Sequence, residues 1–194
     1  MKGNRVKLDG VGAFFLLAAV AIGVSLATGS SDERPSAQPP LTPEERAAAP
    51  KSLQANLAQG NQLIDASIDS RLEGLRGVPV VVNQWASWCP SCRLEFPFFQ
   101  QLSEELRDEV AFLGLDSQDD RGAAEDFLEQ FPVNYPSIFD PSAGEAAAIG
   151  AGQSWPTTVF LDRRGEVTHV RPGGYAKLEQ LRADVERYAL AEGE

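Results

Sequence analysis

Two cysteines three positions apart are the residues of this chain whose type and spacing most directly indicate chemistry. Cys89 and Cys92 are the only cysteines among 194 residues. A structural disulfide framework would need further cysteines, and a zinc site would need four ligands. The single histidine, His169, lies far from the pair in the sequence. The spacing therefore predicts a reversible Cys89–Cys92 disulfide as the redox group, with no metal and no other cofactor.

Disulfide exchange requires a thiolate, and the position of Cys89 favours one. Pro90 follows it where a helix is expected to begin, because proline is tolerated in a first helical turn. Free N–H groups and the helix dipole at that end stabilise a negative sulfur. Cys89 is therefore predicted to be the exposed attacking cysteine. Cys92, one turn further on, is predicted to be buried and to release the bound client.

Glu95 is the third candidate catalytic residue. It follows Cys92 by three positions, so both side chains project from nearly the same face of a helix. A buried carboxyl group has a raised pKa and can exchange a proton near neutral pH. We predict that Glu95 relays a proton to and from Cys92. The alternative is a solvated glutamate on an exposed face.

Alternating strands and helices are expected to position these residues. The apolar run at residues 78–85 is typical of a central strand covered on both sides. The helix that begins at Pro90 should bury a stripe and should be kinked by Pro97 near Arg93. The expected stripe consists of Leu94, Phe98, Leu102 and Leu106.

The remaining pattern completes an α/β domain. A short helix is expected to contain Leu53, Leu57 and Ile64. Later strands are expected at residues 110–115, 135–139, 157–161 and 167–170. Later helices are expected at residues 122–131, 142–149 and 178–188. From residue 78 onward this is the order β-α-β-α-β-α-β-β-α. It predicts a central mixed sheet, parallel at first and antiparallel at the end, with helices on both faces.

The N-terminal part has a different composition. Lys2, Arg5 and Lys7 precede an uncharged apolar stretch at residues 11–28, so residues 1–29 are expected to be a signal anchor or a signal peptide cleaved near Ala27. Either alternative places the rest of the chain outside the cytoplasmic membrane. Residues 30–51, rich in Pro, Ala and Ser, are expected to form an extended linker, and residues 52–194 the folded domain.

The formal net charge of −11 argues against nucleic acid and anionic lipid as partners. Contact with a membrane is therefore expected only through the N-terminal segment, and the domain is expected to be monomeric. Two other polar features have less specific interpretations. His169 is expected to be a surface residue without a catalytic role. Residues 116–120 are expected to be a solvated loop and helix cap, with a metal site as the alternative.

Two longer segments resemble a known family. Residues 80–97, VVVNQWASWCPSCRLEFP, and residues 155–162, WPTTVFLD, resemble the active-site segments of the thioredoxin fold, in its extracytoplasmic TlpA/ResA/DsbE-like branch. The resemblance covers about residues 72–190. It implies a cis peptide bond before Pro156 and an extra strand–helix unit near residues 135–149. Asn83 stands where cytoplasmic thioredoxins have a buried Asp, as is common in this branch.

The resemblance also implies a site and a function. The expected substrate-binding residues are Trp88, Pro90, Trp155, Pro156 and Thr157. The expected activity is thiol–disulfide exchange with protein substrates, such as the reduction of apocytochrome c thiols before haem attachment, with electrons from a membrane thiol carrier. The alternatives are an oxidant of exported proteins and a thioredoxin-like chaperone. A thiol peroxidase is disfavoured, because Ala86 and Val82 stand where that class has Thr or Ser and Pro.

Overall fold

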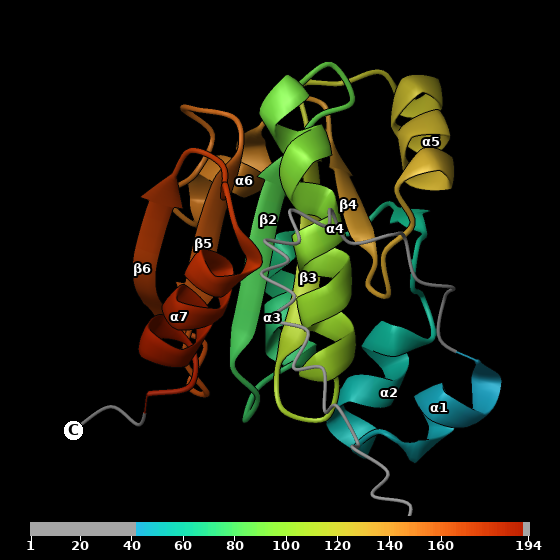
Figure 1. Cartoon of the computed structure of the whole chain (residues 1–194), viewed down its shortest axis with the longest axis vertical. Helices are drawn as coiled ribbons and strands as arrows, with labels where there is room; N and C mark the ends of the chain where they lie inside the picture. Colours follow the sequence, from blue (N-terminus) through green and yellow to red (C-terminus); the bar gives the residue numbers. More distant parts are fainter. Residues whose placement is uncertain (1–41, 192–194) are drawn as a thin grey trace, which may run out of the picture. The chain divides into compact units, whose positions relative to one another are not determined.

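The structure, a computed structural model, describes residues 42–191 (Figure 1). The predicted membrane segment and most of the predicted linker lie outside these residues. Within residues 42–191, no helix combines the length and apolar character needed to cross a bilayer. The elements are, in chain order, α1 (Pro43–Ala48), α2 (Lys51–Leu57), β1 (Leu63–Ile64), α3 (Ile68–Gly74), β2 (Val80–Trp85), α4 (Pro90–Glu105), β3 (Ala111–Ser117), α5 (Arg121–Gln130), β4 (Ser137–Asp140), α6 (Gly144–Ala148), β5 (Thr157–Leu161), β6 (Val167–Pro172) and α7 (Leu178–Tyr188).

The six described strands form one mixed sheet in the order β1-β4-β3-β2-β5-β6. Strands β1, β4, β3 and β2 are parallel to one another. Strand β5 pairs antiparallel with β2, and β6 pairs antiparallel with β5. From β2 onward, the observed order of strands and helices is the predicted one, including the strand–helix unit β4–α6. The α/β architecture and the mixed sheet expected from the sequence are therefore confirmed.

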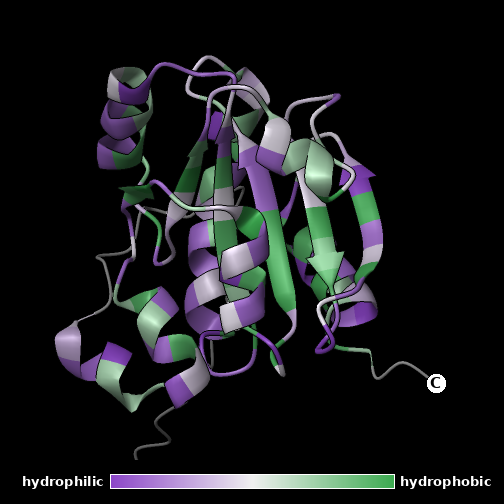
Figure 2. Ribbon diagram, turned by 180° about the vertical axis from the view of Figure 1, so that it is seen from behind, coloured by the Kyte–Doolittle hydropathy of each residue, from purple (hydrophilic) through white to green (hydrophobic). Residues whose placement is uncertain are grey.

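Helices cover both faces of the sheet (Figure 1). Buried residues of α4, α5 and α7 form one core cluster with alternate residues of the strands, and residues of α2, α3 and α6 form the other. In β2, Val81 faces the first cluster while Val80 and Val82 face the second. Figure 2 shows hydrophobic residues along the central strands and mixed polarity on the helices. Burial on both faces explains the continuous apolar run of the central strand.

The ordered domain begins before the predicted boundary. The segment expected to be an extended linker contains α1, which has Pro43 at its first position. Thr42 and Glu45 form a capping box in which the Thr42 hydroxyl accepts from Glu45 N–H at 3.2 Å, and Glu45 Oε2 accepts from Thr42 N–H at 2.7 Å. Ala49 is buried against the second core cluster. This local capping and burial order part of a Pro/Ala-rich segment.

The prediction of one helix containing Leu53, Leu57 and Ile64 is wrong. Helix α2 ends at Leu57, and Ile64 lies in β1, which pairs with β4. Asn61 has a φ of 61°, so the chain turns between these elements. Its backbone N–H donates to Tyr135 O at 3.1 Å, which ties the turn to the segment before β4. This non-local pairing leaves no periodic signal in the sequence.

Helix α4 carries the active-site segment, and its buried face agrees with the predicted stripe in part: Leu102 is buried, and Phe98 and Leu106 are partly buried and pack on the core, but Leu94 does not. Leu94 is 65% exposed, whereas Glu95, Phe96 and Phe99 are buried together with Leu102. The correction amounts to a rotation of the helix, because the residues that pack inward continue from Cys92 at spacings of three and four. The helix continues through Pro97 to Glu105.

A close approach in the sheet fixes the core beneath the active site. Trp85 is fully buried and donates its indole N–H to Ser137 Oγ at 3.1 Å. A Cβ atom on Gly114 would lie 2.1 Å from Ser137 Oγ and 2.9 Å from Trp85 Nε1. Only glycine fits between these groups. Trp85 also packs against Phe96 and Phe127, so it belongs to the core.

Candidate active site

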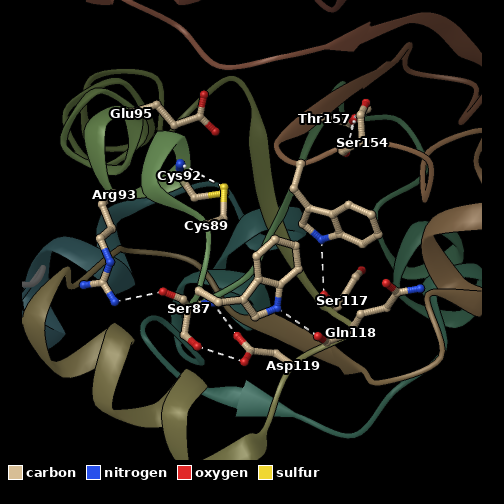
Figure 3. The surroundings of a disulfide bond; sticks show 12 residues. Ser87, Cys89, Cys92, Arg93, Glu95, Ser117, Gln118, Asp119, Ser154 and Thr157 are labelled. Carbon is tan, nitrogen blue, oxygen red and sulfur yellow. Dashed lines mark hydrogen bonds between the residues drawn. A yellow bond between two sulfur atoms is a disulfide. The ribbon is translucent and has the colours of Figure 1, made fainter.

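Cys89 and Cys92 form a disulfide at the N-terminus of α4 (Figure 3). Cys89 is the N-cap residue, and its Sγ accepts a hydrogen bond from the backbone N–H of Cys92 at 3.2 Å. Pro90 occupies the first helical turn and is exposed. The predicted placement of the pair is therefore confirmed. A sulfur held at this position is stabilised as a thiolate by the helix dipole and by that N–H group.

Both sulfur-bearing residues are buried, which corrects one expectation. Cys89 is 2% exposed and Cys92 is fully buried, so the predicted exposure of Cys89 is wrong. Both residues belong to the apolar cluster formed with α4, α5 and α7, and Trp155 packs against that cluster. The sequence predicted the position of Cys89 at a helix end but not its burial, because the loops that pack around Cys89 come from distant parts of the chain.

Glu95 is fully buried on the inner face of α4, so the solvated alternative is wrong. Its Oε2 accepts a hydrogen bond from the backbone N–H of Tyr175 at 3.0 Å. Burial raises the pKa of Glu95 to about 8, against the opposing effects of the Tyr175 N–H, the positive charge of Arg171 and the Asn83 side chain. The carboxyl group therefore changes its protonation near neutral pH, as a proton relay requires. Its catalytic role remains a prediction.

The loop between β6 and α7 supports Glu95. Tyr175 is buried, and its hydroxyl donates to Asp184 Oδ2 at 3.0 Å. The guanidinium group of Arg171 lies 3.8 Å from the centre of the Tyr175 ring and forms an ion pair with Asp184 at 3.2 Å. A Cβ atom on Gly174 would lie 3.5 Å from Glu95 Oε2. Sequence reasoning missed this support, because no motif marks residues that act through one backbone N–H.

The peptide bond between Trp155 and Pro156 is cis, as the resemblance implies. Pro156 is buried, and its carbonyl accepts from Gly173 N–H at 2.8 Å. Thr157 is buried at the start of β5, and its hydroxyl donates to Ser154 O at 2.8 Å. The backbone of Trp155 precedes the strand and takes no part in the pairing of β5 with β2. Substrate binding by these residues remains a prediction.

Two tryptophans flank the disulfide site. Trp88 is 54% exposed and donates its indole N–H to Gln118 O at 2.9 Å. Trp155 is half-buried and donates its indole N–H to Ser117 O at 3.2 Å. The centres of the two rings are 5.5 Å apart. The structure thus brings together the residue before Cys89 and the residue before Pro156, which lie 67 positions apart in the sequence.

The acidic segment at residues 116–120 is only partly the solvated loop that was expected. Asp120 caps α5 by accepting from Ala123 N–H at 3.1 Å, which confirms the predicted cap. Asp116 and Ser117 are instead buried in β3. Burial, together with the nearby charge of Asp119, raises the pKa of Asp116 to about 9. Across residues 42–191, no group of three or more His, Cys, Asp or Glu side chains could hold a metal ion.

His169 is partly buried, and its ring stacks on Tyr188 with centres 4.0 Å apart. It lies on β6, the edge strand of the sheet, which β5 separates from the strand that leads to the cysteines. Its stacking and strand position explain it as a packing residue at the edge of the sheet.

This fold and this site define the class of thioredoxin-like thiol–disulfide oxidoreductases. A mixed sheet places a Cys-x-x-Cys disulfide at a helix N-terminus, and a cis-proline directly precedes β5, which pairs with β2. The chain belongs to the Redoxin family, whose profile matches residues 51–184.

Named relatives agree with this class. The chain is 29% identical to the thiol-disulfide oxidoreductase ResA of Geobacillus kaustophilus over 62% of this chain and 66% of that protein. It is 36% identical to the thiol:disulfide interchange protein DsbE of Pseudomonas fluorescens over 48% of this chain and 51% of that protein. The matches thus span between half and two thirds of the length of these two relatives.

Solved structures show the same fold. The crystal structure of a secreted thiol-disulfide isomerase from Corynebacterium glutamicum aligns with a TM-score of 0.53 and 31% identity. That alignment covers 61% of this chain and 72% of the other chain.

Proposed function

We propose that this protein is an extracytoplasmic thiol–disulfide oxidoreductase that reduces disulfides in protein substrates. The observation that carries the proposal is the Cys89–Cys92 disulfide at the N-terminus of α4, with the buried Glu95 carboxyl one turn further along the same helix. The helix end supplies a thiolate, and Glu95 supplies a proton acceptor whose pKa is raised to about 8.

The reaction begins with the reduced protein. The Cys89 thiolate attacks one sulfur of a client disulfide, forms a mixed disulfide and releases the first client thiolate. Cys92 then transfers its proton to Glu95 and attacks Cys89 Sγ. This forms the Cys89–Cys92 bond and releases the second client thiolate. Two electrons have passed to the client, whose two thiolates take up protons, one of them from Glu95.

The proposed client-binding residues flank the disulfide. Trp88 and Pro90 lie on the cysteine side, while Trp155, Pro156 and Thr157 lie on the side of the cis-proline. An extended client segment can pair with the backbone of Trp155, which precedes β5. The proposed clients are protein thiols and disulfides, including apocytochrome c thiols before haem attachment. The proposed electron donor is a membrane thiol carrier.

The proposed location outside the cytoplasmic membrane rests on the basic and apolar pattern of residues 1–28. It is supported by the similarity to the C. glutamicum thiol-disulfide isomerase, which is a secreted protein. Anchoring through the N-terminal segment and cleavage near Ala27 remain the two alternatives. The N-terminus of the mature protein distinguishes them. A chain that begins just after Ala27 indicates cleavage, and a chain that retains residues 1–27 indicates an anchor.

The decisive experiment measures the reduction potential of the Cys89–Cys92 pair against a glutathione or dithiothreitol redox buffer. A value near or below about −270 mV supports a reductant, whereas a value near about −120 mV makes the protein an oxidant of exported proteins. Failure of the pair to cycle with a dithiol reagent would remove the enzymatic function altogether.

A further inference from the structure

Three consecutive residues at the end of β3, of which Ser117 is the last residue of the strand, hold both sides of the proposed site. Ser117 O accepts the indole N–H of Trp155, and Gln118 O accepts the indole N–H of Trp88. The Asp119 carboxylate accepts from both the backbone N–H and the hydroxyl of Ser87, the latter at 2.8 Å. Figure 3 draws these contacts: those of Gln118 and Asp119 run to the segment before Cys89, and that of Ser117 runs to the indole of the residue before Pro156. The 117–119 segment therefore contacts the cysteine loop and the cis-proline loop at the same time.

The backbone conformation of residues 117–119 suits a segment that contacts both loops. Gln118 has a φ of 57°, a left-handed conformation that is uncommon for a residue with a side chain. The backbone N–H of Gln118 donates to Asp140 O at 3.2 Å, and the Ser117 hydroxyl lies 3.2 Å from Asp140 Oδ2. The segment is thus anchored to β4. Because unusual backbone conformations persist only where surrounding contacts hold them, these anchors explain why it is maintained.

Ser87 is held at each of its polar groups. Its N–H and its hydroxyl are bound by Asp119, and its carbonyl accepts from Arg93 Nη2 at 2.8 Å. Arg93 also stacks over the Phe127 ring at 5.0 Å. Ser87 precedes Cys89 by only two residues, so fixing its backbone fixes the approach of the chain to the attacking sulfur.

Asp119 is suited to this position because it is a carboxylate. Its two oxygens accept from three donors: the Ser87 N–H, the Ser87 hydroxyl and the backbone N–H of Asp120, the last at 2.8 Å. A carboxylate accepts several hydrogen bonds at once, and bonds to a charged acceptor are stronger than neutral ones. An asparagine has one oxygen that accepts, so it cannot satisfy the same set of donors.

We propose that the 117–119 segment sets the spacing between the Cys89 loop and the Trp155–Pro156 loop, with Asp119 as a positioning residue for exchange with protein disulfides. This inference rests on the proposed function. A small disulfide has only to reach the Cys89 sulfur. A protein disulfide must in addition lie along both loops, so its reaction depends on their spacing.

The test compares two substrates for the same pre-reduced protein. The rate of reduction is measured with insulin, as a protein disulfide, and with oxidised glutathione, as a small linear one. Asp119→Asn is expected to lower the rate with insulin about tenfold, the size expected for one charge-assisted hydrogen bond. The rate with oxidised glutathione should change less than about twofold. Trp88→Phe and Trp155→Phe keep an aromatic ring without its N–H and should shift the ratio in the same direction.

Asp120→Asn is the matched control. It changes the neighbouring carboxylate in the same loop, but the bond that it alters caps α5 and does not contact either loop of the site. Its ratio of the two rates should equal that of the wild type. The double variant Ser87→Ala/Asp119→Asn should be no slower with insulin than Asp119→Asn alone, since both changes remove the same contact.

The outcomes separate the two proposals. If the wild type reduces neither substrate, the proposed function fails. If the wild type reduces both, and Asp119→Asn leaves the ratio unchanged or lowers both rates equally, the positioning role is wrong. Should Asp119→Asn fail to fold, Ser87→Ala removes only the hydroxyl bond, and a loss of about threefold confined to insulin is expected. An unchanged ratio in that variant overturns the inference.

Discussion

The Glu95 carboxyl accepts a hydrogen bond from the backbone N–H of Tyr175 at 3.0 Å, although the two residues lie 80 positions apart. This bond joins the helix of the cysteines to the loop before α7. It fixes one oxygen of a fully buried carboxyl group that lies one helical turn after Cys92 on α4. Burial raises the pKa of Glu95 by more than this hydrogen bond lowers it, so the pKa is raised to about 8.

The pH dependence of exchange is the first test of Glu95. Its ionised form accepts the proton of Cys92, so the wild-type rate of client release should rise with pH and show an inflection near pH 8. Glu95→Gln should lose this inflection and react roughly 100-fold more slowly at pH 8. Stopped-flow measurement of mixed-disulfide resolution from pH 6 to 10 gives both profiles. The exposed Glu129→Gln is the control. An identical profile in Glu95→Gln would exclude the relay.

The stability of the fold should also report the raised pKa. The unfolded carboxyl has a pKa near 4.5 and the folded one near 8, so the unfolded chain binds fewer protons between these values. The free energy of unfolding should therefore fall as pH rises from about 4.5 to 8, by up to about 1.4 kcal/mol per pH unit from Glu95, and this contribution should level off above pH 8. Below pH 4.5 the full contribution is present.

Urea denaturation at pH 5 and pH 9 measures this difference. The wild type should lose a few kcal/mol more than Glu95→Gln over that interval. The pKa of Asp116 is raised as well, but Asp116 is present in both proteins, so the comparison isolates Glu95. Parallel losses in the two proteins would contradict the assignment.

The order of attack can be tested by trapping. Cys89 caps the helix and accepts the Cys92 N–H, so its thiolate should react first. Cys92→Ala should accumulate mixed disulfides through Cys89, because the resolving thiol is gone. Cys89→Ala should trap little, because Cys92 lies inside the helix and lacks the N-cap position that stabilises a thiolate. Non-reducing electrophoresis after incubation with an oxidised client measures the adduct. Equal trapping by both variants would reverse the assigned roles.

Gly114→Ala should destabilise the fold strongly. The added Cβ would lie 2.1 Å from Ser137 Oγ and would disturb its bond with Trp85. Overpacking of this kind costs about 1–3 kcal/mol or more. Gly74→Ala is the matched control, since nothing lies within 4 Å of its Cβ position and the residue ends α3. It should be neutral or slightly stabilising. A Gly114→Ala midpoint in urea equal to that of Gly74→Ala would show that the sheet can adjust.

Leu94 distinguishes the observed orientation of α4 from the one expected from periodicity, and Leu102, which is inward in both, is the reference. Leu94 is 65% exposed, so Leu94→Ala should change the free energy of unfolding by less than about 0.5 kcal/mol. Leu102 is fully buried, so Leu102→Ala should cost about 2–5 kcal/mol. Urea denaturation of both variants measures the difference. Similar losses would place Leu94 in the core after all.

The sequence by itself determined the features that depend on neighbours along the chain. The Cys89–Cys92 pair, the helix start at Pro90 and the position of Glu95 three residues after Cys92 follow from local spacing. The order of strands and helices from β2 onward follows from periodicity and breaker residues. These features depend on interactions over a few residues, and such interactions are visible in a single sequence.

Only the tertiary structure decided which groups meet across long separations. It buried Cys89, turned Leu94 to the solvent, placed Ile64 in a strand and set the N–H of Tyr175 against Glu95. It also brought the loop after β3 to the residues before Cys89 and Pro156. Such contacts depend on how helices pack on the sheet and on the paths of loops. Neither leaves a periodic pattern, because the partners are specified by shape and by the pairing of buried polar groups.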